Sequence, residues 1–348
     1  MPTSVRAYAK INLGLYIGPR REDGFHELRT VYQTVDAYDT VRVAAGSGTG
    51  IEIRCKNPNV PSDESNTCWR MAERVLRALK QRRRVVIQIE KNLPVQGGLG
   101  AGSSNAASAM LALERELGQA LSPEDKISIA AEIGSDVPLF LVGGTVLGIG
   151  HGEQVLPLPD LPPLEVVIAT PAVGVSTPHA FADWDALMAS ERAALTPGNP
   201  ASRIDVFSHS MFVWLAGSLS GVPVKDRDRA ENVTPERALR LRSGQAPGAR
   251  YGGAQPTPLL DLVRAGIEND FERVVFPQYP ELREVKRVLE RAGARYASLS
   301  GSGSALFGLF ETPEAAQQAA VVVNEKGIPA RATKTLSRDQ YWKQVSGD

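Results

Sequence analysis

The stretch that most constrains the fold is LPVQGGLGAGSSNAASAMLAL, residues Leu93–Leu113, where glycine-rich backbone leads into an alanine-rich run. Glycine loses more conformational entropy on folding than any other residue. The cluster therefore indicates that φ must be positive there, or that something approaches the backbone closely. We predict a strand over Arg84–Glu90, a glycine loop, and a helix from about Ser103 to Leu117.

A strand, a glycine loop and a helix N-terminus together favour anion binding, because free N–H groups point outward and the helix dipole attracts negative charge. The familiar nucleotide motifs do not match. A P-loop needs a lysine after its last glycine, and here Ser103 and Ser104 follow Gly102. The dinucleotide fingerprint needs a third glycine where Ser103 stands. A phosphate site is one interpretation, and a tight turn that packs a helix against a sheet is the other.

Charge balance argues against several partners. The 348 residues contain 39 Lys+Arg and 39 Asp+Glu, so the formal net charge is +0 and no overall field favours nucleic acid or an acidic membrane surface. The basic run at Lys80–Arg84 is interpreted as a solvated helix end. We expect small-molecule substrates, no nucleic acid, no membrane, and a monomer or homodimer.

Cysteine and histidine usage indicates neither a metal site nor a disulfide scaffold. The two cysteines, Cys55 and Cys68, and the four histidines show no paired metal-ligand spacing, so we expect no protein-held metal. The N-terminus lacks a charged head followed by a long apolar run, and no stretch is apolar enough to span a bilayer. The expected location is the cytoplasm.

The chain length suggests about two domains, and the proline-rich stretch LPLPDLPPLEVV marks the boundary. We predict an N-terminal domain over residues 1–163 and a C-terminal domain over 164–348. The segment 195–258 is rich in Gly, Pro and mixed charge, and it is predicted to be an atypical insertion.

Three further motifs are candidates for chemistry. Lys10 and Asn12 lie among small and apolar residues in AYAKINLGL, Asp136 lies in GSDVPLF, and SLSGSGSALFGLF holds a second glycine-serine loop. Each has an ordinary structural explanation: a strand lysine that reaches water, a turn aspartate, and a hairpin turn.

Taken together and in this order, the motifs resemble the GHMP kinase superfamily of small-molecule kinases. AKINLGL is similar to its first motif, PVQGGLGAGSSNAA to its second and SGSGSALFGLF to its third. The resemblance implies an α+β fold of two domains with the active site in the cleft between them. It also implies ATP with Mg²⁺ as co-substrate and no tightly bound prosthetic group.

Longer stretches resemble one branch of that superfamily. They are AKINLGLYIGPRREDGFHELRTVYQ, GSDVPLFLVGGTVLGIGHGEQVLPL and ENDFERVVFPQYPEL. Members of this branch phosphorylate the 2-hydroxyl of 4-diphosphocytidyl-2-C-methyl-D-erythritol in non-mevalonate isoprenoid biosynthesis. The alternatives are a GHMP kinase for homoserine or mevalonate and a non-catalytic ligand sensor. The DGFH stretch and Phe181 argue against the first alternative, and Lys10 with Asp136 against the second.

The resemblance implies roles for individual residues. Asp136 would accept the proton of the acceptor hydroxyl and Lys10 would stabilise the charge of the transferring phosphoryl group. The implied ATP-binding residues are Pro94, Gly97, Gly98, Leu99, Gly100, Ala101, Gly102, Ser103 and Ser104. The implied substrate-binding residues are Asn12, Phe25, His26, Tyr32, Phe181, Gly301 and Ser302. Phe25 and Phe181 would sandwich the cytosine, and His26 would hydrogen-bond its edge.

Four positions depart from the pattern of the branch. Phe25 stands where tyrosine is more usual, Tyr8 where proline is common, Ala101 where glycine is common and Tyr32 where phenylalanine often lies. Ala101 adds a Cβ to the glycine loop, which matters only if that residue needs a positive φ.

Overall fold

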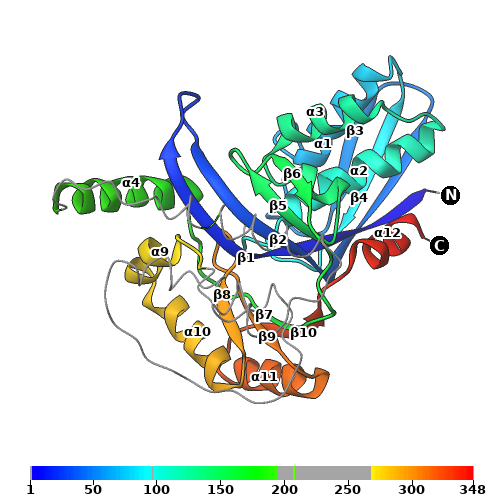
Figure 1. The fold of residues 1–348 in the computed structure, drawn as a ribbon. Helices are drawn as coiled ribbons and strands as arrows, with labels where there is room; N and C mark the ends of the chain where they lie inside the picture. The colour runs from blue at the N-terminus through cyan, green and yellow to red at the C-terminus, as the bar shows by residue number, and fades with distance from the viewer. Residues whose placement is uncertain (1, 96, 195–206, 208–267, 348) are drawn as a thin grey trace, which may run out of the picture.

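The computed structural model describes residues 2–95, 97–194, 207 and 268–347, apart from the side chains of residues 192–194. The protein is built on two β-sheets whose strands are mainly antiparallel (Figure 1). The first has the order β3-β4-β2-β5-β6, with β1 paired to β2, and the second has the order β10-β7-β9-β8. The expected α+β class is confirmed.

The strands of the first sheet are β1 (Thr3–Arg20), β2 (His26–Gly46), β3 (Gly50–Cys55), β4 (Arg84–Glu90), β5 (Thr145–Ile149) and β6 (Gln154–Pro157). Those of the second are β7 (Glu165–Ala169), β8 (Tyr296–Leu299), β9 (Leu306–Phe310) and β10 (Ala330–Lys334). The helices are α1 (Thr67–Ala78), α2 (Ala101–Leu117), α3 (Pro123–Ile133), η1 (Pro138–Leu141), α4 (Thr177–Ala194), α9 (Glu272–Gln278), α10 (Pro280–Arg291), α11 (Pro313–Glu325) and α12 (Arg338–Ser346).

The sequence of residues 4–17 predicts short strands interrupted at AKIN, and this prediction is wrong, because strand β1 is continuous from Thr3 to Arg20. The pairing with β2 absorbs the irregularity in register shifts after Tyr8 and after Asn12. Such bulges bend a strand and re-aim its side chains. The long β1–β2 hairpin belongs to the first sheet and extends beyond it toward α4 (Figure 1). Lys10 and Asn12 lie on its strand β1.

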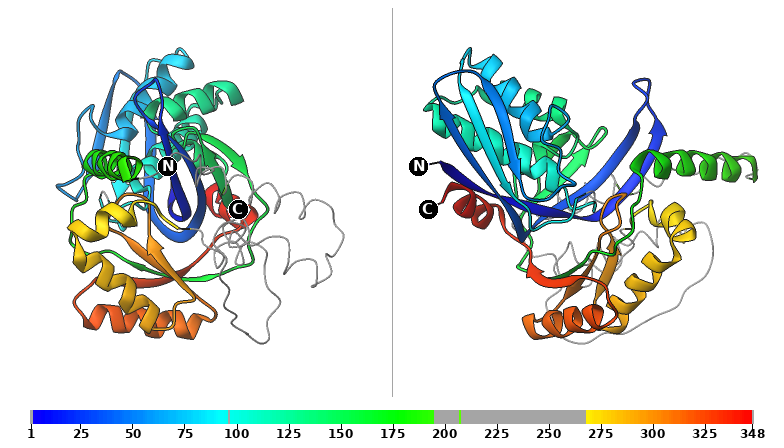
Figure 2. Two further views of the ribbon diagram at one scale, coloured as in Figure 1. Left: turned by 60° about the vertical axis from the view of Figure 1, so that its left-hand side comes forward. Right: turned by 180° about the vertical axis from the view of Figure 1, so that it is seen from behind.

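The hairpin also supplies the core between the two sheets. Strand β7 alternates, with Val166 and Ile168 facing the hairpin residues Ile11 and Leu13. Val167 and Ala169 instead face the helices α10 and α11, which cover the outer face of the second sheet (Figure 2). One apolar layer therefore joins both sheets.

Helix α12 packs against the first sheet, although it follows the last strand of the second. Its Tyr341 is buried beside Tyr8, with ring centroids 5.7 Å apart, and the Tyr341 hydroxyl donates to the carbonyl of Phe140 at 2.7 Å. The departure at position 8 thus has a structural role, since Tyr8 forms part of the surface on which this helix docks.

The predicted insertion, 195–258, lies outside the described residues except for Phe207, whose ring stacks on Tyr16 at 4.8 Å. Across the described parts of the chain, no helix combines the length and apolar character needed to cross a membrane.

Candidate active site

The glycine loop follows the end of β4 and leads into the N-terminus of α2. Gly98 and Gly100 adopt positive φ angles of 84° and 68°, and Gly100 is the N-cap of the helix. Among the residues that the structure describes, no side chain caps this end. The first N–H groups of α2 are therefore available to an anion, as the sequence pattern suggests. Ala101 is the first helical residue, so its Cβ causes no strain.

The second glycine-serine loop docks directly against the first. Ser300 Oγ donates to the carbonyl of Gly98 at 3.0 Å, and the Ala305 N–H donates to the carbonyl of Gly97 at 2.9 Å. The loops approach so closely that a Cβ on Gly98 would lie 2.1 Å from the Ser300 carbonyl oxygen. The anion-binding loop is therefore shaped by the second sheet as well as by the first.

Lys10 and Asp136 form an ion pair at the centre of the cleft. Lys10 Nζ lies 3.4 Å from Asp136 Oδ2, and the Lys10 side chain is 3% exposed against 30% for Asp136. Burial raises the pKa of Tyr32 well above its ordinary value, and the nearby Asp136 carboxylate raises it further. The Tyr32 phenol therefore stays protonated and donates to Asp136 Oδ1 at 2.9 Å. Asp136 Oδ2 is the oxygen left to face a substrate.

A buried hydrogen-bond chain fixes the lysine. Lys10 Nζ donates to Asn12 Oδ1 at 2.7 Å, Asn12 Nδ2 donates to Thr30 Oγ1 at 2.8 Å, and Thr30 Oγ1 donates to the carbonyl of Gly14 at 2.8 Å. A Cβ on Gly301 would lie 3.4 Å from both Lys10 Nζ and Asn12 Oδ1. The ammonium group therefore has one defined position, and Gly301 leaves space beside it.

Aromatic rings gather where the tip of the β1–β2 hairpin meets α4. His26 stacks on Phe181 with centroids 4.9 Å apart and an interplanar angle of 11°, and its Nε2 lies 2.8 Å from Asp185 Oδ1. Phe25 is 56% exposed and stacks instead on His151, with centroids 4.8 Å apart. The two phenylalanines expected to sandwich a base are thus each paired with a histidine.

One cleft of about 1170 Å³ brings nearly all the predicted residues together. Leu99 and Ser104 do not line it. The Leu99 side chain is buried in the core, although its carbonyl accepts from the Lys10 N–H at 3.0 Å. The side chain of Ser104 is buried too, and its Oγ has no hydrogen-bond partner among the described residues. Ser302 lines the cleft and bonds Thr177 through their hydroxyl oxygens at 2.7 Å.

Sequence reasoning missed a group of cleft residues beside the glycine loop and others near Asp136. The first group comes from the β3–α1 connection, the start of α1 and the end of β4: Val60, Pro61, Asn66, Thr67, Ile89, Lys91 and Val95. The second comprises Ser135 and His151, and one further missed residue, Asp185, lies on α4 beside His26. Asn66 could be predicted as a helix cap, and it does accept from the Cys68 N–H. Nothing local in the sequence placed it in a cleft.

Comparison with known proteins agrees with this geometry. The model for the GHMP kinases N terminal domain matches residues 66–144, and that for GHMP kinases C terminal matches residues 257–329. The crystal structure of L. major mevalonate kinase in complex with R-mevalonate has a TM-score of 0.61 at 14% identity. The match covers 96% of both chains and supports the fold alone.

Relatives of higher identity share one name, 4-diphosphocytidyl-2-C-methyl-D-erythritol kinase. The relative from Solibacter usitatus is 35% identical, with 99% of this chain and 93% of the relative covered. The relative from Desulfitobacterium hafniense is 33% identical, with 97% of each covered. A crystal structure of 4-(cytidine 5'-diphospho)-2C-methyl-D-erythritol kinase has a TM-score of 0.65 at 29% identity, covering 96% of this chain and 99% of the other. The resemblance is thus confirmed, and the chain belongs to the 4-diphosphocytidyl-2-C-methyl-D-erythritol kinase family of the GHMP kinases.

Proposed function

We propose that the protein transfers the γ-phosphoryl group of ATP to the 2-hydroxyl of 4-diphosphocytidyl-2-C-methyl-D-erythritol, a step of non-mevalonate isoprenoid biosynthesis. The observation that carries the proposal is the Lys10–Asp136 pair, which lines one cleft together with the uncapped N-terminus of α2 and with the rings of Phe25 and Phe181. Family membership supports the same activity. The proposed location is the cytoplasm, and the proposed activity requires no membrane partner.

The ATP phosphates are assigned to the glycine loop, where N–H groups of α2 face the cleft. The adenosine would extend toward Asn66, Lys91 and Val95, which line the cleft beside the loop. Mg²⁺ would arrive with ATP. Asn105 Oδ1 is buried without a hydrogen-bond partner among the described residues, and Asn105 lines the cleft, so this amide oxygen fits one ligand position. Phosphate oxygens and water would supply the others.

The proposed reaction needs positioning and charge neutralisation more than covalent chemistry. The 2-hydroxyl oxygen attacks the γ-phosphorus while the bond to the bridging oxygen of ADP breaks. Asp136 Oδ2 takes the hydroxyl proton and later releases it to water. Lys10 stabilises the negative charge on the transferring group, and the hydrogen bond to Asn12 keeps the ammonium in place.

The cytosine of the acceptor is assigned to the aromatic end of the cleft, which Phe25, His26 and Phe181 line. Stacking on an aromatic ring contributes about 1–3 kcal/mol per base. An acceptor without a base, such as homoserine or mevalonate, would leave these rings unused.

An ADP-release assay tests the proposal directly. The purified protein, ATP and Mg²⁺ are combined with 4-diphosphocytidyl-2-C-methyl-D-erythritol, homoserine or mevalonate in parallel. We expect turnover with the first acceptor alone. Turnover with homoserine or mevalonate would contradict the assignment of a cytosine pocket. ATP binding without turnover of any of the three acceptors would favour the ligand sensor.

His26→Ala is expected to raise the KM for the cytidine acceptor about tenfold and to change the KM for ATP by less than about twofold. The expected loss is one hydrogen bond to the base edge, worth about 0.5–1.5 kcal/mol for a neutral pair and more for a charged one. Steady-state kinetics with each substrate varied in turn measures both constants. His179→Ala is the control, since His179 is exposed and does not line the cleft. An equal rise in both KM values would place His26 outside the base pocket.

A further inference from the structure

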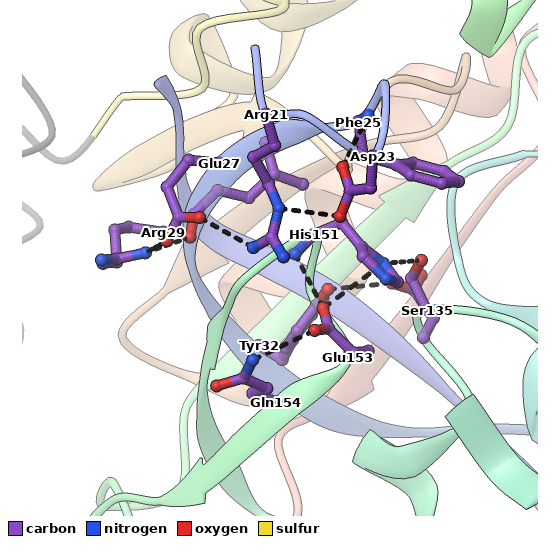
Figure 3. A network of polar contacts seen from close by, with 12 residues as sticks. Arg21, Asp23, Phe25, Glu27, Arg29, Tyr32, Ser135, His151, Glu153 and Gln154 are labelled. Atoms are coloured by element: carbon purple, nitrogen blue, oxygen red, sulfur yellow. Dashed lines mark hydrogen bonds and ion pairs between the residues drawn. The ribbon is translucent and has the colours of Figure 1, made fainter. Parts of the chain in front are cut away.

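His151 lies in the turn between β5 and β6, and no role follows for it from the motifs. Its ring packs under Phe25, and its Nδ1 lies 2.7 Å from Ser135 Oγ and 3.3 Å from Glu153 Oε2 (Figure 3). The backbone N–H of His151 also donates to Glu153 Oε2 at 2.7 Å. The ring therefore has a defined orientation, set by contacts to its flat face and to one of its two nitrogens.

These contacts place His151 between the two ends of the acceptor site. On one side is Phe25, assigned to the base. On the other is Ser135, the residue immediately before Asp136. The neighbouring Gly152 packs against the Tyr32 hydroxyl, which holds Asp136: a Cβ on Gly152 would lie 2.7 Å from that oxygen. His151 thus spans the path from the aromatic rings to the reacting carboxylate.

The second ring nitrogen is available to a ligand. His151 lines the cleft and its side chain is 23% exposed, and Nε2 has no hydrogen-bond partner among the described residues. Glu153 lies on the Nδ1 side of the ring. Asp23 is a second carboxylate close to His151, and its pKa is lowered mainly by the hydrogen bond from the Phe25 N–H. Arg20 lines the same cleft and adds a cation.

The acceptor supplies an anion for this position. In 4-diphosphocytidyl-2-C-methyl-D-erythritol a diphosphate joins the cytidine to the polyol that carries the reacting hydroxyl. With the base at Phe25 and the hydroxyl at Asp136, the diphosphate must lie in the stretch of cleft between them. Ser135 Oγ can donate to Nδ1, which leaves Nε2 as the ring nitrogen that donates to the diphosphate.

We propose that His151 is a specificity-determining residue that binds the diphosphate of the acceptor through Nε2. This inference rests on the proposed function, and it assigns a ligand group to a residue outside the kinase motifs. A charged hydrogen bond of this kind is stronger than a neutral one. His151 therefore makes the protein bind a nucleoside diphosphate more tightly than the nucleoside that carries the same base.

The test compares two ligands that differ only in the diphosphate. Dissociation constants of cytidine and CDP are measured by isothermal titration calorimetry with the full chain, in the presence of a saturating non-hydrolysable ATP analogue that occupies the ATP end. His151→Gln is expected to weaken CDP about tenfold, or about 1.4 kcal/mol, and to change cytidine by less than about twofold. His151→Arg is expected to keep the CDP preference, because guanidinium both stacks on aromatic rings and binds phosphate.

A matched variant separates this role from support of the aromatic ring. Phe25→Leu removes the stack without changing charge, and it should weaken cytidine and CDP by the same factor. If His151→Gln also weakens both ligands equally, or changes neither, His151 does not bind the diphosphate and the inference is wrong. If the unaltered protein binds neither cytidine nor CDP, the proposed function fails first, and the inference fails with it.

Discussion

Asp136→Asn is expected to lower kcat by about a thousandfold while the dissociation constant of ATP stays within about threefold. Asparagine has nearly the same shape, and its Oδ1 can still accept the hydrogen bond from the Tyr32 hydroxyl. It cannot take a proton from the acceptor hydroxyl, and it no longer balances the charge of Lys10, whose Nζ lies 3.4 Å away. Loss of a positioned general base typically lowers the rate by about 10²–10⁴-fold, and a thousandfold loss is the middle of that range.

Single-turnover kinetics at saturating substrates, combined with calorimetric titration of ATP, measures the two quantities separately. Tyr32→Phe is the control, since it removes the hydroxyl that orients Asp136 and keeps the carboxylate. We expect a loss of only about tenfold there, the size of one lost hydrogen bond to a charged group. Full activity in Asp136→Asn would show that another group accepts the proton.

Local sequence signals mark the starts of three helices. Asn66 caps α1, Ser122 caps α3 with Pro123 in its first turn, and Thr312 caps α11 ahead of Pro313. Each cap satisfies backbone N–H groups within a few residues, so its effect is visible without knowledge of the rest of the chain. Helix α2 begins at Ala101, two residues before the predicted start, because Gly100 acts as the N-cap through its backbone alone.

The position of helix α12 and the continuity of strand β1 depend on long-range packing, which local sequence patterns do not show. Helix α12 was not predicted, although Ser337 and Gln340 form a capping box that marks its start. Its position on the first sheet depends on Tyr8, more than 300 residues earlier in the chain. Likewise, β1 stays continuous through AKIN because its pairing with β2 accommodates bulges, and pairing partners cannot be derived from one strand alone.

Some residues of the candidate site can be predicted from local sequence motifs, and others are brought to it only by the fold. Lys10, Asp136 and the two glycine loops belong to contiguous motifs, so the amino-acid sequence alone is enough to propose them. His151 and Asp185 enter the cleft only because the hairpin tip, the β5–β6 turn and α4 converge on it. Their roles depend on partners distant in sequence, such as Phe25 for His151 and His26 for Asp185.

Gly98→Ala is expected to lower the free energy of unfolding by about 2–5 kcal/mol and to weaken ATP at least about tenfold. Gly98 has a φ of 84°, where a Cβ costs about 1–2 kcal/mol. That Cβ would also lie 2.1 Å from the carbonyl oxygen of Ser300. A backbone oxygen cannot move aside by rotating a side chain, so the two glycine loops must separate. Overpacking of this kind adds about 1–3 kcal/mol.

Gly102→Ala is the matched substitution for stability, because it changes a glycine only four residues away in a different environment. Gly102 lies in α2, and its added Cβ would meet only Thr67 Oγ1 at 3.8 Å. Alanine is favoured over glycine inside a helix by about 0.5–1 kcal/mol, so this variant should be at least as stable as the parent. Denaturant unfolding and ATP titration of both variants measure the difference. If Gly98→Ala matches Gly102→Ala in stability and the parent protein in ATP affinity, the close docking of the two loops is not what shapes the phosphate site.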